Sequence, residues 1–236
     1  MKHIQIWSDF ACPFCWIGEK RLNDAIKELG VENEVKITYR AFELDPNAPI
    51  KPKEGTTSEG LAKKYGISEE EAKNRIAAIE KMAKDVHLDM NFKNVKRTST
   101  FDAHRLMKFA ETNYEQSIVD ALNFSLFFAY FTKNESLADR KLLLKLAEEA
   151  GLDATQSNEV LNSDLFARDV RYDEQEAMDR GVHGVPYMVF DGEFAVPGAI
   201  SVDDCKKALR DMLGKVKEKP EGFKTQTCDE NGCKVD

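Results

Sequence analysis

The sequence predicts an α/β fold in which a four-stranded mixed sheet, flanked by helices, is interrupted by a large inserted α-helical domain. Three observations predict it. A strand–helix–strand pattern opens the chain, about 120 residues without strand signals follow, and two short strands and a helix come after them. The chain has 236 residues, 42% of them hydrophobic, and this composition can fill a substantial core.

The first unit is a strand, a helix and a second strand. Residues 2–8 alternate in polarity and are rich in Ile and Trp, which is typical of a β-strand. Apolar residues then recur at helical spacing from Cys12 to Leu29, and Gly30 follows as a stop signal. Residues 35–42 alternate again. Crossover connections between strands of one sheet are almost always right-handed, so we expect the two strands to be parallel.

The middle of the chain is helical. Prolines and a glycine between residues 46 and 55 break regular structure, and Ser68 with Glu71 predicts the start of a helix that reaches about Val86. Residues 101–112, 115–131, 139–150 and 165–180 also have helical periodicity. We therefore expect an inserted helical domain over residues 56–180.

Strand signals return at residues 187–190 and 193–196. Asp191-Gly192 between them predicts a tight hairpin, because the turn needs positive φ at both central residues. Ser201 then caps a last helix, whose apolar stripe contains Cys205, and this predicts a buried thiol without chemistry. This order is the thioredoxin arrangement. It gives a discontinuous sheet domain, residues 1–55 and 181–217, and a C-terminal tail, residues 218–236.

Charge and composition exclude several functions. The net charge of −8 without a basic stripe argues against nucleic acid as a partner. No apolar run approaches the ~18 residues needed to cross a bilayer. The first residues, MKHIQIWSDF, lack the features of a secretory signal, which predicts a cytoplasmic protein. In such a reducing compartment, five cysteines favour catalytic, metal-binding or buried thiols over a disulfide framework.

Two of these cysteines form a C-P-F-C motif directly after the first strand. Five cysteines scattered over 236 positions would give only about 0.1 such pairs by chance. Pro13 suits the first position of a helix, which places Cys12 at the helix N-terminus, where the partial positive charge stabilises a thiolate. Cys15 lies one turn later on the same face. The spacing therefore predicts that Cys12 attacks a disulfide and that Cys15 displaces the product.

The residues between the cysteines, Pro13 and Phe14, tune the reduction potential but carry no charge or imidazole that would predict its value. Coincidence, or half of a zinc site, is the other interpretation of the motif. Zinc needs further ligands, and a proline inside a helix-initiating C-x-x-C is the redox context.

Pro186 begins the third strand in the segment GVHGVPY. A cis Val185–Pro186 bond is the prediction beside a C-x-x-C motif, although a trans proline at the start of a strand would be the ordinary expectation. In the cis form, the backbone of Val185 would be available to pair with an extended substrate segment beside Cys12.

At these residues the chain resembles the DsbA-like branch of the thioredoxin superfamily, and within it the cytosolic FrnE-like dithiol–disulfide oxidoreductases and isomerases. The resemblance spans nearly the whole chain and rests on four blocks: SDFACPFCWIG at residues 8–18, DAHRL at 102–106, GVHGVP at 181–186 and VPGA at 196–199.

The resemblance implies Cys12 and Cys15 as the redox pair and Pro186 as the cis-proline. It also implies that His104 and Arg105 lie on a surface of the helical domain that faces the site, with His104 binding substrate. From its position in the sequence alone, His104 has no assigned role.

The same branch contains 2-hydroxychromene-2-carboxylate isomerase and the kappa-class glutathione transferases. These relatives carry serine at the helix start and bind glutathione, whereas this chain keeps both cysteines. A glutathione-dependent small-molecule isomerase or transferase is therefore the alternative function.

A second cysteine pair lies in the tail. Asn231-Gly232 favours a turn between Cys228 and Cys233, which can bring them within disulfide distance. FrnE-like proteins resemble this chain in having a C-x4-C pair near the C-terminus. An auxiliary redox pair that exchanges electrons with Cys12 and Cys15, a passive tail, and a zinc site built from all four sulfurs are the three hypotheses.

We therefore expect a thiol–disulfide oxidoreductase or isomerase that needs no metal and no bound cofactor. Its partners would be protein or small-molecule thiols and disulfides, with a low-molecular-weight thiol such as glutathione as a conceivable co-substrate. A zinc-binding or redox-sensing module is a further alternative, and whether the protein is a homodimer stays open.

Overall fold

The computed structural model describes residues 1–52, 55–214, 226–229 and 232–235, the last two ranges by their backbone only. The chain opens with β1 (Lys2–Ser8), α1 (Pro13–Leu29) and β2 (Val35–Ala41). β1 and β2 are parallel over their full lengths. α1 ends at Gly30, whose φ of +65° is the left-handed conformation that glycine adopts without steric cost.

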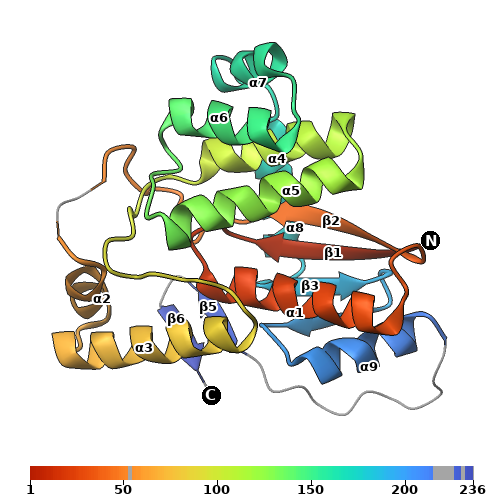
Figure 1. The fold of residues 1–236 in the computed structure, drawn as a ribbon, viewed down its shortest axis with the longest axis horizontal. Helices are drawn as coiled ribbons and strands as arrows, with labels where there is room; N and C mark the ends of the chain where they lie inside the picture. The colour runs from red at the N-terminus through yellow and green to blue at the C-terminus, as the bar shows by residue number, and fades with distance from the viewer. Residues whose placement is uncertain (53–54, 215–225, 230–231, 236) are drawn as a thin grey trace. The chain divides into compact units, whose positions relative to one another are not determined.

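Two further strands complete the sheet (Figure 1). β3 (Tyr187–Phe190) is antiparallel to β1, and β4 (Phe194–Pro197) is antiparallel to β3, so the strand order is β2-β1-β3-β4. Asp191 and Gly192 both have positive φ, 50° and 73°, as the predicted hairpin turn requires. The four-stranded mixed sheet confirms the thioredoxin-like fold.

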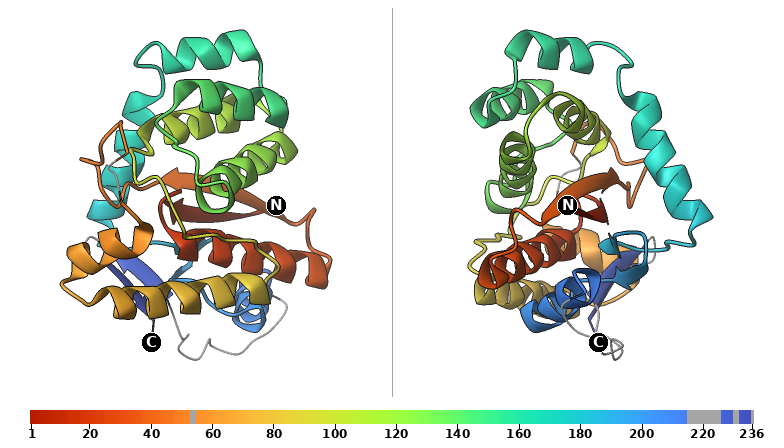
Figure 2. Two further views of the ribbon diagram at one scale, coloured as in Figure 1. Left: turned by 60° about the vertical axis from the view of Figure 1, so that its left-hand side comes forward. Right: turned by 90° about the vertical axis from the view of Figure 1, so that its right-hand side faces the viewer.

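α1 and α9 (Val202–Met212) pack against each other on one face of the sheet (Figures 1 and 2). The Ser201 hydroxyl caps α9 by accepting a hydrogen bond from the amide of Asp204. Cys205 is fully buried on the inner face of α9, as its place in the apolar stripe predicted.

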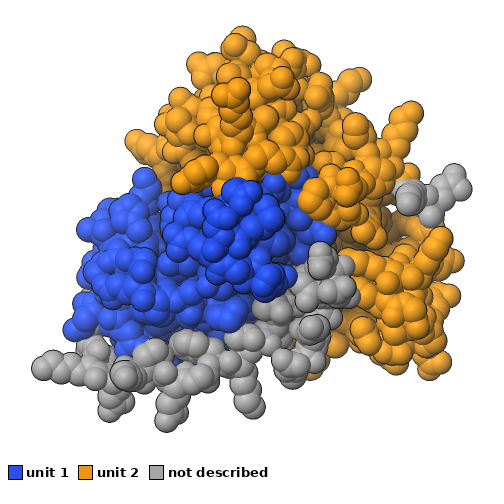
Figure 3. All heavy atoms as spheres, turned by 180° about the vertical axis from the view of Figure 1, so that it is seen from behind, with its two compact units in different colours: residues 1–44, 173–236 blue, residues 45–172 orange. Residues whose placement is uncertain are grey.

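The chain divides into two compact units, coloured separately in Figure 3: residues 1–44 with 173–236, and residues 45–172. These limits differ from the predicted ones at 55/56 and 180/181. α8 (Ala167–Asp179) crosses the second limit because Asp173 binds the sheet. Its carboxylate accepts hydrogen bonds from Arg40 and from the amide of Ala41, and its carbonyl accepts one from the indole of Trp7.

The second unit is helical. Three of its helices match the predicted ranges within one or two residues: α3 (Glu69–Asp85), α4 (Phe101–Asn113) and α6 (Arg140–Ala150). Two others were not predicted: α2 (Thr57–Tyr65), which has a capping box of Thr56 and Glu59, and α7 (Ala154–Leu161).

The predicted helix over residues 115–131 has an irregular end. α5 (Gln116–Phe127) continues as a π-helix, η1 (Phe128–Thr132). Phe127 and Phe131 are buried in the core, whereas the exposed Phe124 stacks on Phe128 at 5.9 Å between ring centroids.

The tail contains two short strands, β5 (Gln226–Asp229) and β6 (Gly232–Val235). They are antiparallel, with Cys228 opposite Cys233. β5 contacts α1 within the first unit. Throughout the described ranges, each helix is too short or too polar to cross a bilayer.

Candidate active site

Cys12 is the N-cap residue of α1, and Pro13 occupies the first helical position, as the motif predicted. The amide of Cys12 donates to the carbonyl of Asp9 at 2.9 Å, and the amide of Cys15 donates to the carbonyl of Cys12 at 3.1 Å. The first turn of α1 contains no acidic residue. Cys12 therefore lies at the positive end of the helix dipole, without a neighbouring carboxylate in the first turn.

The Val185–Pro186 segment lies against Cys12. The peptide bond is cis, as predicted. The thiol of Cys12 is 3.6 Å from the carbonyl oxygen of Val185, within hydrogen-bond range for sulfur. The amide of Gly198 donates to the carbonyl of Pro186 at 2.7 Å, which fixes the segment to the end of β4. Residues 174 positions apart along the chain, Cys12 and Pro186, thus form one site.

Gly18 permits this close packing. A Cβ atom at this position would lie 3.2 Å from Cγ of Pro186 and 3.3 Å from Cβ of Ala199. Such distances are shorter than ordinary carbon–carbon contacts. No function was predicted for Gly18, although a glycine inside an amphipathic helix indicates close packing of another segment.

Both cysteines of the motif are fully buried, with no solvent-exposed surface. Burial is the main cause that raises the pKa of Cys15 well above its ordinary value. Hydrogen bonding with Cys12 and the negative charges of Cys12 and Glu19 raise this pKa further, whereas a hydrogen bond from the Asp9 backbone lowers it. Cys15 is therefore held as a thiol.

Two carboxylates that the sequence analysis missed are buried around the motif. Asp9 is 1% exposed, and its side chain accepts hydrogen bonds from the amides of Ala11 and Leu44. Glu19 is 3% exposed and accepts one from the Ser8 hydroxyl at 2.7 Å. The helical spacing contained a signal for Glu19, because it lies four residues after Cys15 on the apolar face of α1.

His104 and Arg105 lie in α4 of the second unit. Both side chains are buried, at 4% and 3% exposure, and their place on a surface of the helical unit that faces the site stays a prediction. The guanidinium of Arg105 binds the carboxylate of Asp102 and donates to three backbone carbonyls of the same unit, those of Val160, Ser163 and Leu165. Arg105 therefore stabilises the helical unit. The role of His104 in substrate binding stays a prediction.

Three cysteines lie outside the C-P-F-C motif: Cys205, Cys228 and Cys233. Burial raises the pKa of Cys205 to about 12, so this thiol is unreactive near neutral pH, as its position predicted. The backbone register places Cys228 opposite Cys233, but their side chains, and the Asn231 turn, lie outside the described residues. Among the side chains that the structure describes, no group of three His, Cys, Asp or Glu residues could hold a metal ion.

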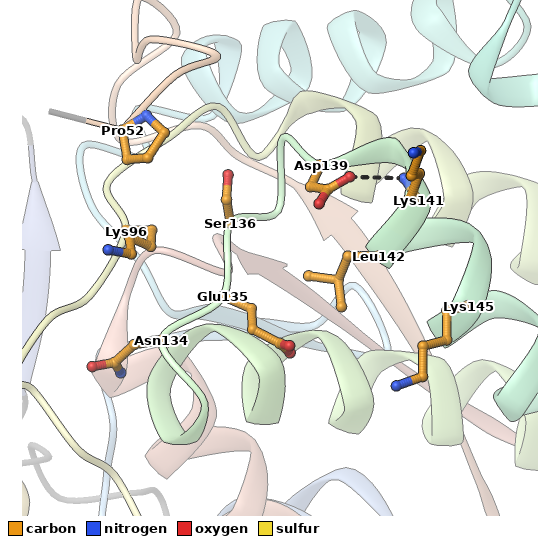
Figure 4. Close-up of a pocket in the computed structure, with 9 residues that line it drawn as sticks. All are labelled: Pro52, Lys96, Asn134, Glu135, Ser136, Asp139, Lys141, Leu142 and Lys145. Carbon is orange, nitrogen blue, oxygen red and sulfur yellow. Dashed lines mark hydrogen bonds between the residues drawn. The ribbon is translucent and has the colours of Figure 1, made fainter.

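A surface hollow of about 390 Å³ lies within the helical unit (Figure 4). It contains none of the predicted site residues. Its charged lining mixes both signs, and the nine lining residues are Pro52, Lys96, Asn134, Glu135, Ser136, Asp139, Lys141, Leu142 and Lys145.

The chain is similar in sequence and in fold to several known proteins. The chain is 31% identical to a probable DsbA oxidoreductase from Streptomyces coelicolor, whose crystal structure superposes with a TM-score of 0.83 over 100% of both chains. It is 28% identical to the uncharacterized protein YwbO of Bacillus subtilis (strain 168), over 89% of this chain and 96% of that protein. A structure of 2-hydroxychromene-2-carboxylate isomerase, 16% identical, shares the fold with a TM-score of 0.65, over 90% of this chain and 95% of the isomerase.

The model of one protein family, described as the DSBA-like thioredoxin domain, matches residues 3–210. This range contains the C-P-F-C motif, the helical unit and the cis-proline segment. Together with the sheet order and the Cys12–Pro186 site, the match shows that the chain belongs to the DSBA-like thioredoxin domain family.

Proposed function

We propose that this protein catalyses thiol–disulfide exchange through Cys12 and Cys15. One observation carries the proposal: Cys12 caps α1 one turn before Cys15, and its thiol lies 3.6 Å from the carbonyl of Val185. A helix N-terminus stabilises a thiolate, and the thiolate is the form that attacks disulfides.

In the proposed reaction, the Cys12 thiolate attacks one sulfur of a substrate disulfide and releases the other as a thiol. Cys15 then attacks the mixed disulfide at Cys12, which forms the Cys12–Cys15 disulfide and releases the second substrate thiol. The reverse sequence oxidises a dithiol. Pro13 and Phe14, both uncharged, separate the two sulfurs and take part by setting the local polarity of the site.

The segment at Val185 and Pro186 would align the substrate. Because the Val185 carbonyl lies beside the Cys12 sulfur, a substrate chain that pairs with this backbone brings its own disulfide to Cys12. Cys12 has no exposed surface, so its surroundings must open before a substrate reaches it. Substrates would be protein or small-molecule disulfides, with glutathione as a conceivable reductant. The proposed compartment is the cytoplasm, whose reducing poise would return the pair to the dithiol form.

Reduction of insulin by the protein in the presence of a dithiol reductant tests the proposal. We expect activity above the uncatalysed rate, and its complete loss in Cys12→Ser. The control is Cys205→Ala, which removes a buried thiol far along the chain from the motif and should keep most of the activity. Full activity in Cys12→Ser would contradict the proposal, and glutathione-dependent turnover of an electrophile by that variant would favour the isomerase or transferase alternative.

Cys228 and Cys233 are proposed as an auxiliary redox pair. Two backbone observations support this: the two residues face each other in the β5–β6 ladder, and β5 contacts α1. Replacing both with serine should slow multiple turnovers of insulin reduction while leaving the first turnover intact. Unchanged multiple-turnover rates would contradict a relay, and stoichiometric zinc in the metal analysis of the wild-type protein would favour the metal-site hypothesis.

A further inference from the structure

The turn between β1 and α1 is held by the buried carboxylate of Asp9. This residue directly follows β1 and is 1% exposed. Its Oδ1 atom accepts a hydrogen bond from the amide of Ala11 at 3.1 Å, and its Oδ2 atom accepts one from the amide of Leu44 at 2.7 Å. Losing either bond would leave a buried polar group unsatisfied, which costs free energy. The carboxylate therefore ties the turn to the segment that follows β2.

The bond to Leu44 extends the pairing of β1 and β2 beyond the ends of the strands. A main-chain bond at these ends runs from the amide of Phe42 to the carbonyl of Ser8 at 3.1 Å. In a parallel ladder, the next amide that needs a partner lies two residues later, at Leu44. There β1 has already ended, and the Asp9 carbonyl accepts the amide of Cys12 at 2.9 Å instead. The Asp9 carboxylate thus takes the place of a strand carbonyl.

The backbone of Asp9 reaches both cysteines of the motif. Its carbonyl accepts the amide of Cys12, and the carbonyl of Cys12 in turn accepts the amide of Cys15 at 3.1 Å. The Asp9 backbone also hydrogen-bonds to the Cys15 sulfur. Burial, Cys12 and Glu19 raise the pKa of Cys15, whereas this hydrogen bond lowers it, because a donor that faces a sulfur favours the thiolate. The position of the Asp9 amide therefore matters when Cys15 becomes charged.

The charge on Cys15 develops in the release step. The thiolate, not the thiol, attacks the mixed disulfide at Cys12. Because the Cys15 side chain has no exposed surface, groups of the protein rather than bulk water must stabilise this charge. Donors that are already fixed in place stabilise a developing charge more than donors that must first reorient. A firmly held Asp9 amide would therefore accelerate this step.

We propose that Asp9 is a positioning residue for the release step: its carboxylate holds the turn so that the Asp9 amide stays on the Cys15 sulfur while this sulfur attacks. The inference rests on the proposed thiol–disulfide exchange. In this step the Cys15 sulfur bonds to the Cys12 sulfur, and the bond from Cys12 to the substrate sulfur breaks. Cys15 is oxidised and the substrate sulfur is reduced. The proton of Cys15 ends on the departing substrate sulfur, so the step balances without a further reagent.

The charge of Asp9 and its positioning of the turn have effects of opposite sign. A negative charge near Cys15 disfavours the thiolate, so a role through charge predicts that removing the carboxylate accelerates the release step. A role through position predicts that the same change slows the step, because the amide is no longer fixed on the sulfur. The direction of the change in rate therefore distinguishes the two roles.

Stopped-flow reaction of the reduced protein with dithiobis-nitrobenzoate separates the two chemical steps. The first coloured thiolate appears when Cys12 attacks the reagent, and the second appears when Cys15 releases the thiol still bound to Cys12. The protein used carries Cys228→Ser and Cys233→Ser, so that the tail does not contribute.

Asp9→Asn is the test variant. Its single carbonyl oxygen can accept from the amide of Ala11, but its NH₂ group cannot accept from the amide of Leu44. We expect the second phase to be about tenfold slower, the usual size of a lost hydrogen bond to a charged group. The first phase should stay within about twofold of the wild-type rate, because the helix N-terminus that stabilises the Cys12 thiolate is unchanged.

Asp173→Asn is the matched control. Asp173 is also 1% exposed in the same unit, and its carboxylate accepts the amide of Ala41, three residues before Leu44, at 3.0 Å. Its bonds to Ala41 and Arg40 hold β2 and not the turn before α1. The substitution should lower the free energy of unfolding but leave both phases at the wild-type rates. A selective slowing of the second phase in this control would overturn the proposal.

Three results with Asp9→Asn would also overturn it: an unchanged second phase, a faster second phase, and equal slowing of both phases. The second of these would assign Asp9 a role through charge, and the third would assign it a general role in folding. A wild-type protein without a first phase would instead contradict the exchange function itself.

Should Asp9→Asn fail to fold, Asp9→Ser is the second variant. Serine is smaller, and its hydroxyl can accept from the amide two residues later, that of Ala11, as in the turns that serine commonly forms. It is too short to hold Leu44 at the same time. The proposal expects the same selective slowing of the second phase, whereas an unchanged ratio of the two rates would overturn it.

Discussion

Burial is the main cause of a raised pKa at two cysteines of the sheet unit, whose surroundings differ. At Cys15, in the C-P-F-C motif, hydrogen bonding with Cys12 and the charges of Cys12 and Glu19 raise the pKa further. At Cys205, burial outweighs the Arg21 guanidinium, whose charge lowers the pKa, and the charge of Asp204 raises it further. Position on an apolar stripe was enough to predict Cys205 as a core residue. Glu19 was not predicted, although its helical spacing from Cys15 was a signal, because its hydrogen-bond partner Ser8 lies in β1 and only the fold brings the two together.

The Cys205 thiol should make the free energy of unfolding depend on pH in the alkaline range. Its pKa is about 12 in the folded protein and near the ordinary 9.0 when unfolded, so above about pH 9 unfolding releases a proton. The free energy of unfolding therefore falls as pH rises from 9.0 toward 12. In Cys205→Ala this contribution is absent, and the difference in stability between wild type and variant should shrink by about 1.4 kcal/mol per pH unit in this window.

Denaturant unfolding of both proteins under reducing conditions, from below to above pH 9, measures this difference. At neutral pH the variant should be the less stable protein, because the alanine leaves part of the sulfur's volume unfilled. A stability difference that stays constant with pH would show that Cys205 ionises equally in both states.

At the scale of elements, α1 combines two tasks: it presents the motif at its start and packs closely against the cis-proline segment one turn later. Hydrophobic spacing predicted the extent of α1, and its stop at Gly30. The hydrophobic spacing did not predict that α5 ends at Phe127. The π-helix η1, which follows it, keeps its apolar residues on the same side and therefore leaves no periodic signal of its own. It also missed α2 and α7, which are short and carry few buried residues.

Two helical glycines make a matched test of the packing of α1. A Cβ at Gly60 in α2 would meet no atom within 4 Å, whereas one at Gly18 would lie 3.2 Å from Pro186. Gly60→Ala should stabilise the protein by about 0.5–1 kcal/mol, the usual gain from helix propensity. Gly18→Ala should instead destabilise the protein, because overpacking costs about 1–3 kcal/mol and outweighs the gain from helix propensity.

Denaturant unfolding gives both values, and insulin reduction reports whether the displaced Pro186 segment still aligns substrate. We expect reduced activity in Gly18→Ala and unchanged activity in Gly60→Ala. Equal stabilisation by the two substitutions would contradict the close approach of α1 to Pro186.

At the scale of the whole molecule, the chain leaves the sheet after β2, builds a helical unit and returns to the sheet through α8. The pattern of strand and helix signals predicted this discontinuity, and with it the approach of Cys12 to Pro186. The limits of the units were not predictable, because they depend on single long-range bonds. Asp173 binds the sheet unit through Arg40, Ala41 and Trp7, which lie more than 130 positions earlier. The buried positions of His104 and Arg105 equally depend on tertiary packing that a helix pattern does not contain.

Trapping of a disulfide-bonded substrate tests the central claim, that Cys12 captures the substrate sulfur and Cys15 releases it. The Cys15→Ser protein should accumulate a covalent complex with insulin, sensitive to reductant, in which mass spectrometry locates the bond at Cys12. Wild-type protein should show little of it, and Cys12→Ser none. A complex attached at Cys205, Cys228 or Cys233, or equal trapping by Cys12→Ser, would contradict the account.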